Sequence, residues 1–224
     1  MKQLWKNFKN AIVAVDIVIF TIEDNDLKVL LIKMKKEPFQ EMWAVPGGLV
    51  GVEESLDSSA KKHLFNKTGI KNVYLEQLYT FGEVDRDPLG RVISTAYFAL
   101  MPNEGLSLKT TEEYEGVQWF SIKDLPKLAY DHKDIIRKAQ SRLKAKLSYT
   151  NIVYSLLPNE FTLTDLQRTY EIILGEVMDK RNFRKKILSL NMIKKTDRQT
   201  TGGASRPAAF YKFIKKSPQI IEIL

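Results

Sequence analysis

Two neighbouring stretches decide the fold: Trp43-Ala44-Val45-Pro46-Gly47-Gly48 and, after thirteen intervening residues, Lys62-His63-Leu64-Phe65-Asn66-Lys67-Thr68-Gly69-Ile70. The first ends in a glycine pair, which predicts a tight loop. Between them Ser55 or Asp57 can cap a helix, and Gly69 can end that helix in the left-handed conformation. Because positions three and four apart are neighbours on a helix, the second stretch predicts a helical face made of lysine, histidine and asparagine.

The spacing resembles the signature of Nudix hydrolases, in which a Gly is followed by five residues, a Glu, seven residues and Arg-Glu-apolar-x-Glu-Glu-x-Gly-apolar. The matching positions are Gly48, Glu54, Leu64, Gly69 and Ile70. The family's glutamates hold Mg²⁺ against a pyrophosphate, but here the Arg and three of the Glu positions are Lys62, His63, Asn66 and Lys67. An ammonium repels a cation that requires hard anionic oxygen ligands. We therefore expect a Nudix-like domain with no catalytic residues, no metal site and no cofactor.

Strand patterns surround this motif. Apolar runs at Ala11–Phe20 and Lys28–Ile32 flank the turn residues 23–26 and predict a hairpin. Further strands are expected at Val73–Phe81, Arg91–Met101 and Gly116–Phe120, and a short helix at Ile122–Leu125. Together they match the mixed sheet of a Nudix-like α/β/α sandwich, which we place at residues 1–130.

Charge is distributed unevenly along the chain. Residues 1–130 hold 16 Lys+Arg and 18 Asp+Glu, whereas residues 131–224 hold 19 Lys+Arg and 9 Asp+Glu, so the excess of +8 lies in the second part. A basic half of this kind usually meets a polyanion, although a solvated helical domain is the plain alternative. Without cysteine, disulfides and thiolate metal sites are excluded, and without an apolar 18-mer or lipidation signal we expect a cytoplasmic protein with no membrane contact.

The second part has the element order of a winged helix-turn-helix. Ile136, Ala139, Leu143 and Leu147 recur at helical steps and predict a linking helix at 131–148, before a small domain at 149–224. That domain starts with a short helix at Asn151–Leu157. Its next helix is capped by Thr162 or Thr164, with Thr164-x-x-Gln167 in the form of a capping box.

A third helix, starting at Asp179, has the features of a DNA recognition helix. Phe183, Ile187 and Leu190 form its buried stripe. The opposite face presents Lys180, Arg181, Arg184 and Lys185, and Asn182 either reads adenine or holds the helix end. Met192–Thr196 and Ala208–Phe213 can pair as the wing, with Arg198 and Arg206 at its tip for phosphate or minor-groove contact. An RNA ligand is disfavoured because the basic half lacks a pattern of exposed aromatic residues.

At this point the resemblance becomes specific. A Nudix-like domain followed by the sequences of residues 130–136, 179–187 and 205–208 looks like the Nudix-related transcriptional regulator family, over essentially the whole chain. The resemblance implies an α+β protein that binds a palindromic operator in double-stranded DNA as a homodimer. It also implies that a metabolite in the Nudix domain releases the DNA, namely ADP-ribose in one branch and a pentose in a sugar-catabolic branch.

The candidate effector-binding residues gather in or near the former active-site cleft: Asp16, Trp43, Glu83, Asp85, Arg86, Asp87 and His132. Carboxylates with an aromatic face suit a neutral polyol, so we favour a pentose such as arabinose and a role in carbohydrate metabolism. Arg86 and Arg91 would suit the diphosphate of ADP-ribose instead. Asp131-His132 is expected to cap and orient the linking helix and is a candidate for coupling the domains.

Plainer interpretations remain for these residues. Trp43 is also typical of a core, and 85–90 of an ordinary turn. The alternative to a ligand-released repressor is a Nudix-type nucleoside diphosphate hydrolase with an accessory basic domain. In that case the metal would depend on Glu53 and Glu54, with a base from another loop, which would leave a weak, water-rich site.

Overall fold

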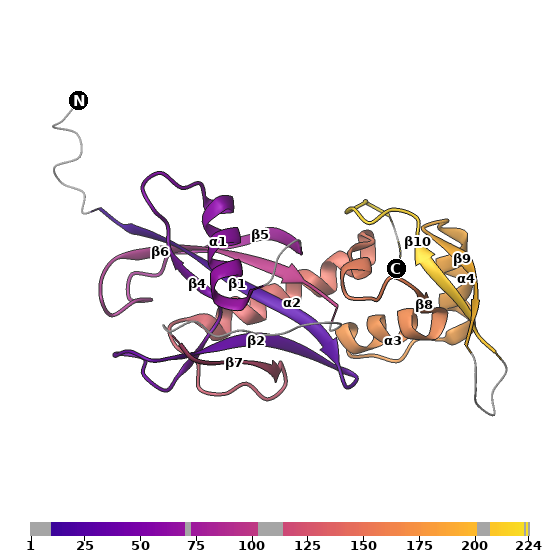
Figure 1. The fold of residues 1–224 in the computed structure, drawn as a ribbon, viewed down its shortest axis with the longest axis horizontal. Coiled ribbons are helices and arrows are strands. Elements are labelled where there is room, and N and C mark those ends of the chain that lie inside the picture. The colour runs from indigo at the N-terminus through magenta and orange to yellow at the C-terminus, as the bar shows by residue number, and fades with distance from the viewer. Residues whose placement is uncertain (1–9, 70–72, 103–113, 201–206, 222, 224) are drawn as a thin grey trace. The chain divides into compact units, whose positions relative to one another are not determined.

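The computed structural model describes residues 10–69, 73–102, 114–200, 207–221 and 223. These residues form two compact units. The first holds the described residues among 1–19, 29–99 and 107–139, and the second those among 20–28, 100–106 and 140–224 (Figure 1). The seven-stranded sheet lies in the first unit except at residues 20–28 and 100, and the three-stranded sheet lies in the second. Each sheet is described separately below.

The Nudix-like sheet is built on a long hairpin. Strands β1 (Ile12–Glu23) and β2 (Asp26–Met34) are joined by Asp24 and Asn25, whose φ angles of 52° and 61° suit the right-handed twist of a two-residue hairpin turn. The other strands are β3 (Trp43–Ala44), β4 (Gly47–Leu49), β5 (Tyr74–Phe81), β6 (Val92–Leu100) and β7 (Tyr114–Ser121). The sheet order is β3-β2-β1-β6-β5, with β4 paired to β1 and β7 to β2.

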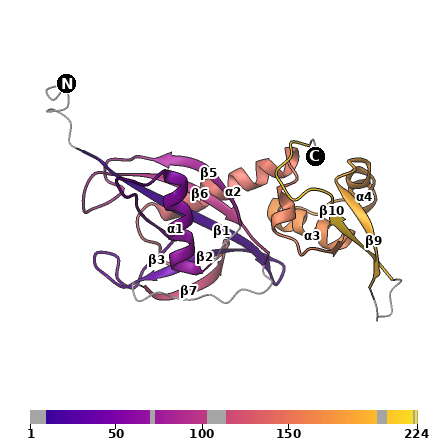
Figure 2. The same ribbon diagram turned by 45° about the horizontal axis from the view of Figure 1, so that its top comes forward.

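Helix α1 (Leu56–Thr68) follows β4 and carries the degenerate motif. Ser55 is its N-cap and accepts a hydrogen bond from the backbone N–H of Ser58, so Ser55, not Asp57, makes the cap. Gly69 ends the helix at φ 73°, as expected for a left-handed C-cap. The buried side chains of Ala60 and Leu64 hold α1 to the sheet, and the first turns of α2 lie on the sheet's other side (Figure 2).

The expected short helix at Ile122–Leu125 is absent; the chain forms a turn there. Ser121 explains the difference, because its hydroxyl accepts the N–H of Lys123 and its carbonyl accepts the N–H of Asp124. Pro126 then disfavours a helical conformation at Leu125. The prediction of a helix at this position was wrong.

Helix α2 (His132–Tyr149) is the predicted linking helix. Ile136, Ala139, Leu143 and Leu147 are all buried, which confirms the stripe expected from their spacing. Residues of α2 up to Ala139 belong to the first unit and those from Gln140 to the second. One continuous helix therefore carries the chain from one unit to the other.

The second unit has a winged-helix arrangement. After the 3-10 turn η1 (Ile152–Ser155), which is shorter than the expected helix, come β8 (Phe161–Thr162), α3 (Leu163–Leu174), α4 (Lys180–Ser189), β9 (Ile193–Gln199) and β10 (Ala209–Phe213). The three strands pair in the order β8-β10-β9. Phe161, Leu166, Tyr170, Ile173 and Ile187 are fully buried and form the core beneath both helices.

Local caps fix the helices of this unit. Thr162 and Asp165 form a reciprocal capping box at the start of α3, so the box expected at Thr164 and Gln167 was misplaced by two residues. Gly175 ends α3 with φ 80°. The chain's C-terminal segment then returns to the end of α2, where the N–H groups of Ile221 and Ile223 donate to the carbonyls of Tyr149 and Ser148.

Candidate effector site and nucleic-acid interface

A cavity of about 200 Å³ lies in the first unit, beside the glycine pair that the sequence singled out. It is walled by β1, β2, β4, the loop before β6 and the start of α2. The polar side chains in its lining are Asp16, Arg86, Asp87, Tyr114, Tyr130 and His132. Gly47 permits this arrangement, because a Cβ there would lie 2.4 Å from Oδ1 of Asp16 and 2.5 Å from the carbonyl oxygen of Val15. A larger residue at Gly47 would displace the carboxylate or the strand.

Asp16 is the centre of a buried hydrogen-bond network. Its Oδ2 accepts from the hydroxyl of Ser94 at 2.6 Å and from Nη2 of Arg86 at 3.2 Å. Its Oδ1 lies 3.5 Å from Nε2 of His132. Burial alone would raise the pKa of Asp16, but His132, Ser94 and Arg86 outweigh it and lower the pKa from 3.8 to about 2. Asp16 is therefore an ionised carboxylate at neutral pH.

Arg86 and His132 connect this carboxylate to the start of α2. The Arg86 guanidinium makes two hydrogen bonds to Asp131, from Nε to Oδ2 at 2.9 Å and from Nη2 to Oδ1 at 2.7 Å. His132 accepts the backbone N–H of Val45 on Nδ1 at 3.1 Å. A proton on neutral His132 therefore occupies Nε2, the nitrogen that faces Asp16.

The structure brings four of the seven predicted effector residues to the cavity: Asp16, Arg86, Asp87 and His132. Trp43 does not line it; its ring packs edge-on against Phe120 with centroids 4.5 Å apart. Glu83 and Asp85 are exposed and also lie outside the lining. Arg91, the other proposed diphosphate partner, holds the loop, because its Nη1 donates to the carbonyls of Gly82 and Glu83.

Sequence reasoning missed several residues of this site. Ser94, Tyr114 and Tyr130 were not proposed, and Asp131 was expected as a helix cap and a candidate for coupling the domains, not as a residue of the effector site. Ser94 could have been found by the signal that revealed Asp16, because it is a polar residue within an apolar buried strand. Tyr130 and Asp131 gave no comparable signal, since Asp131 meets Arg86 across 45 positions of sequence.

The degenerate motif on α1 does not fit Mg²⁺. Glu54 forms an ion pair with Lys62 and accepts the N–H of Gly51 at 3.1 Å, so its carboxylate is already engaged. Lys62 first, and then Gly51, hold the pKa of Glu54 below its usual range. His63 packs against Gly48 and contacts the carbonyl of Leu49 with its Nε2 at 3.0 Å. Asn66 is exposed, and the side chain of Lys67 lies outside the described residues.

Metal-ligand clusters were sought throughout the described part of the chain. Within it, no group of three or more His, Asp or Glu side chains is placed to hold a metal ion. None of the described helices is both long and apolar enough to cross a membrane.

Helix α4 presents most of its basic residues to solvent. Asp179 caps it by accepting the N–H of Asn182 at 2.7 Å, and Phe183 and Ile187 face the core. Lys180, Arg181, Asn182 and Lys185 are exposed. Arg184 is held differently: it is half-buried, and its Nη2 donates to the hydroxyl of Thr164 on α3 at 3.1 Å. Arg184 is thus held against α3, whereas the exposed residues are accessible to a ligand.

The wing residues are placed differently from expectation. Arg198 lies within β9, not at the tip of the hairpin, and its Nη1 pairs with Oε2 of Glu160 at 2.6 Å. Its guanidinium also lies over the ring of Phe210, 5.1 Å from the centroid. Its side chain remains 69% exposed, so the face of the guanidinium is accessible. Arg206 lies outside the described residues.

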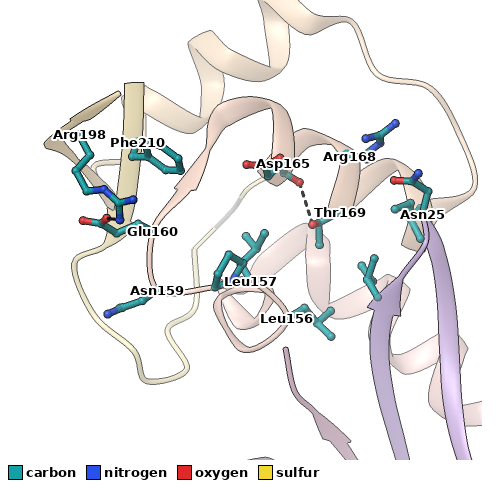
Figure 3. A pocket seen from close by; sticks show the side chains of 13 residues that line it. Asn25, Leu156, Leu157, Asn159, Glu160, Asp165, Arg168, Thr169, Arg198 and Phe210 are labelled. Carbon is teal, nitrogen blue, oxygen red and sulfur yellow. Dashed lines mark hydrogen bonds and ion pairs between the residues drawn. The ribbon is translucent and has the colours of Figure 1, made fainter. Parts of the chain in front are cut away.

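A hollow of about 750 Å³ lies in the second unit, next to α3 (Figure 3). Its charged groups are largely engaged, because Glu160 pairs with Arg198 and Asp165 belongs to the cap of α3. The hydroxyl of Thr169 donates to the carbonyl of Asp165, as drawn in Figure 3. The predicted effector residues are not in its lining. The smaller cavity of the first unit is thus the better effector site.

These features define a class of protein in which a Nudix-type unit is joined to a winged-helix unit. Residues 12–139 match the model of the NUDIX domain, and residues 153–213 match the model described as the NrtR DNA-binding winged helix domain. The chain belongs to the NrtR family of Nudix-related transcriptional regulators, as the sequence resemblance indicated.

Three matches, to two relatives, place the chain within that family. It is 36% identical over 211 residues to a protein of Acinetobacter baylyi named ADPR responsive transcriptional repressor NtrR, which covers 92% of this chain and 84% of that one. It is similar to Shewanella oneidensis NrtR solved with a 27mer DNA, at 32% identity and a TM-score of 0.79, covering 90% of this chain and 93% of that chain. The NUDIX domain of the same Shewanella protein, solved with ADP ribose, matches 62% of this chain and 92% of that chain at 35% identity and a TM-score of 0.56.

Proposed function

We propose that this protein is a transcriptional repressor that binds a palindromic operator as a homodimer and releases it when ADP-ribose enters the cavity of the Nudix unit. The observation that carries the proposal is the exposed basic face of α4 in the same chain as a cavity lined by Arg86 and Asp87. The family's winged-helix domain supports DNA as the partner, and the name of the Acinetobacter relative supports ADP-ribose as the effector.

ADP-ribose replaces the pentose that the sequence favoured. The relatives give no support to a sugar-responsive branch or to a role in carbohydrate metabolism, and one is solved with ADP ribose. The volume of about 200 Å³ would suit a pentose, and it is below the roughly 300–1,000 Å³ of drug-sized ligand sites. A ligand as large as ADP-ribose must therefore extend beyond the enclosed space, with only part of it against Asp16, Arg86 and His132.

We further propose that the Nudix unit senses its ligand without hydrolysing it. Support comes from the residues at the former metal site: Lys62 on α1 neutralises Glu54 in the preceding loop, and the neighbouring positions on α1 are His63 and Asn66. A divalent cation bound there would have to displace an ammonium and would find few anionic oxygens.

The proposal is tested by selecting a DNA duplex from a random library with the purified protein and then measuring binding by fluorescence anisotropy. A two-fold dimer places two recognition helices roughly 34–36 Å apart, so the selected sequence should be an inverted repeat with half-sites one helical turn apart, or a multiple of that distance. The titration is repeated with ADP-ribose, NAD, arabinose and xylose. A thermal-shift panel of the same compounds measures ligand binding without DNA.

ADP-ribose should release the duplex and raise the stability of the free protein by about 2.7 kcal/mol at a hundredfold excess over its Kd. Release by a pentose alone would replace ADP-ribose as the effector. Failure to select any duplex would remove DNA as the partner and leave the hydrolase as the principal alternative.

A further inference from the structure

We propose that the Arg86–Asp131 ion pair is a switch that reports occupancy of the cavity to helix α2. This inference rests on the proposed function, because it assumes that an anionic effector enters the cavity and that DNA is released in response. It adds the residues through which the two events are coupled.

Arg86 is placed to bind a ligand and to hold Asp131 at the same time. Its side chain is 3% exposed, yet it lines the cavity. Nε and Nη2 are occupied by Asp131 and Asp16. Among the described residues, no acceptor is found for Nη1, so its two N–H groups are left for a ligand. A phosphate engages a guanidinium through two parallel hydrogen bonds. Across Nη1 and Nη2 it competes with Asp16, and across Nε and Nη2 it displaces Asp131.

Of the two carboxylates bound to Arg86, Asp131 is the one that a ligand can displace at lower cost. Asp16 is held by Ser94 and His132 as well as by Arg86, and its side chain is 9% exposed. Asp131 is 18% exposed, and its carboxylate has no other hydrogen-bond donor among the described residues. Loss of the pair therefore costs less at Asp131, which water can solvate, than at Asp16, which would become a buried unpaired charge.

The backbone just before α2 is strained at Tyr130. Tyr130 lines the cavity and has φ 51°, a left-handed conformation that is unfavourable for a bulky side chain. Its ring packs on Phe39 and His132, with centroid distances of 4.1 and 5.1 Å. Packing at Tyr130 and the ion pair at Asp131 both hold this conformation, so breaking the pair removes one of its restraints.

Helix α2 begins immediately after these residues, at His132, and its later turns belong to the second unit. A change at Asp131 therefore alters the start of the helix that continues into the winged-helix unit. In the free protein the ion pair fixes the conformation that binds DNA. An anionic ligand on Arg86 favours the other conformation. The free energy by which the ligand shifts this equilibrium equals the difference between its binding free energies for the two conformations.

The test compares Asp131→Asn with Asp134→Asn, a matched loss of one carboxylate on an exposed i, i+3 ion pair with Arg137. For each full-length protein, the DNA Kd is measured by anisotropy with and without saturating ADP-ribose, and ADP-ribose binding is measured by calorimetry. The coupling factor is the ratio of the DNA Kd with saturating ADP-ribose to the DNA Kd without it. Such factors are typically about 5–150-fold. Asp131→Asn should bind ADP-ribose but lower the coupling factor to within about twofold of one. Asp134→Asn should keep the wild-type factor.

Arg86→Lys provides a second measurement, because lysine keeps the charge but cannot make the paired hydrogen bonds to Asp131. It should also reduce the coupling factor, and it should weaken binding to the selected duplex, because the ion pair that fixes the DNA-binding conformation is lost. If ADP-ribose releases DNA from the wild type and both Asp131→Asn and Arg86→Lys keep the wild-type coupling factor, the switch is overturned. The proposed function would then remain intact. A wild-type protein that binds DNA and is not released by ADP-ribose would overturn the proposed function, and this inference with it.

Discussion

Lys62 on α1 forms an ion pair with Glu54 in the preceding loop, where a Nudix hydrolase requires a carboxylate free to bind metal. Glu54 would be a metal ligand in a Nudix hydrolase, but here its pairing with Lys62 holds the loop to the helix. Gly51 adds to it by donating its N–H to the same carboxylate. The first prediction follows directly from this contact.

With Mg²⁺ or Mn²⁺, the purified protein should hydrolyse neither ADP-ribose nor sugar nucleotides above background, because the remaining donors cannot neutralise a bridging cation. Product release is followed by chromatography, with Glu54→Gln assayed in parallel at the same concentration. Turnover that is present in the wild type and lost in Glu54→Gln would show that this site is still active.

The second prediction concerns acid stability. The pKa of Asp16 is about 2 in the folded protein, below its value of 3.8 in the absence of interactions. A depressed folded pKa contributes stability above pH 3.8 that is lost as the pH falls toward 2. The difference in unfolding free energy between wild type and Asp16→Asn should therefore shrink by about 1 kcal/mol between pH 7 and pH 3.

Urea titrations at both pH values measure this difference, and Asp134→Asn serves as the exposed control. A difference that stays constant with pH would mean that Asp16 contributes through packing and not through its charge.

The third prediction concerns sequence reading by α4. Arg181→Ala should weaken binding to the selected duplex by about 1–3 kcal/mol if Arg181 contacts a guanine, and should weaken binding to random DNA much less. Arg137→Ala, which removes an exposed arginine from α2, should change neither affinity. Equal losses on both duplexes would reassign Arg181 from base contact to phosphate contact.

The fourth prediction concerns the wing. Glu160 engages Arg198, so Glu160→Gln should free the guanidinium for a phosphate and steepen the dependence of log Kd on log salt by about one contact. Asp197→Asn is the control, because it removes a neighbouring exposed charge without touching that ion pair. An identical salt slope in wild type and Glu160→Gln would place Arg198 away from the DNA backbone.

The sequence predicted elements whose signals are local. The linking helix could be predicted from the spacing of its apolar residues, and the start of α4 from Asp179, which caps it. Asp16 was found because a carboxylate within a buried strand needs partners. The turn at Ile122–Leu125 was missed because the hydroxyl of Ser121 competes with helix formation.

The site was harder to predict, because its residues meet through long-range pairing. Nothing local indicates which side of β3 the Trp43 ring faces, and pairing with β2 directs it toward Phe120. Likewise, Asp131 is an ordinary residue before a helix until the fold brings Arg86 to it. Its importance follows from tertiary contact alone.

The contact between His63 and Gly48 bears on whether the metal-binding motif can be restored by substitution. A Cβ at Gly48 would lie 2.4 Å from Cε1 of His63, so the imidazole fills the space left by the glycine. Reverting His63 to glutamate in a single step would remove that packing while Lys62 still neutralised Glu54. A single reversion would therefore cost packing without restoring a metal site.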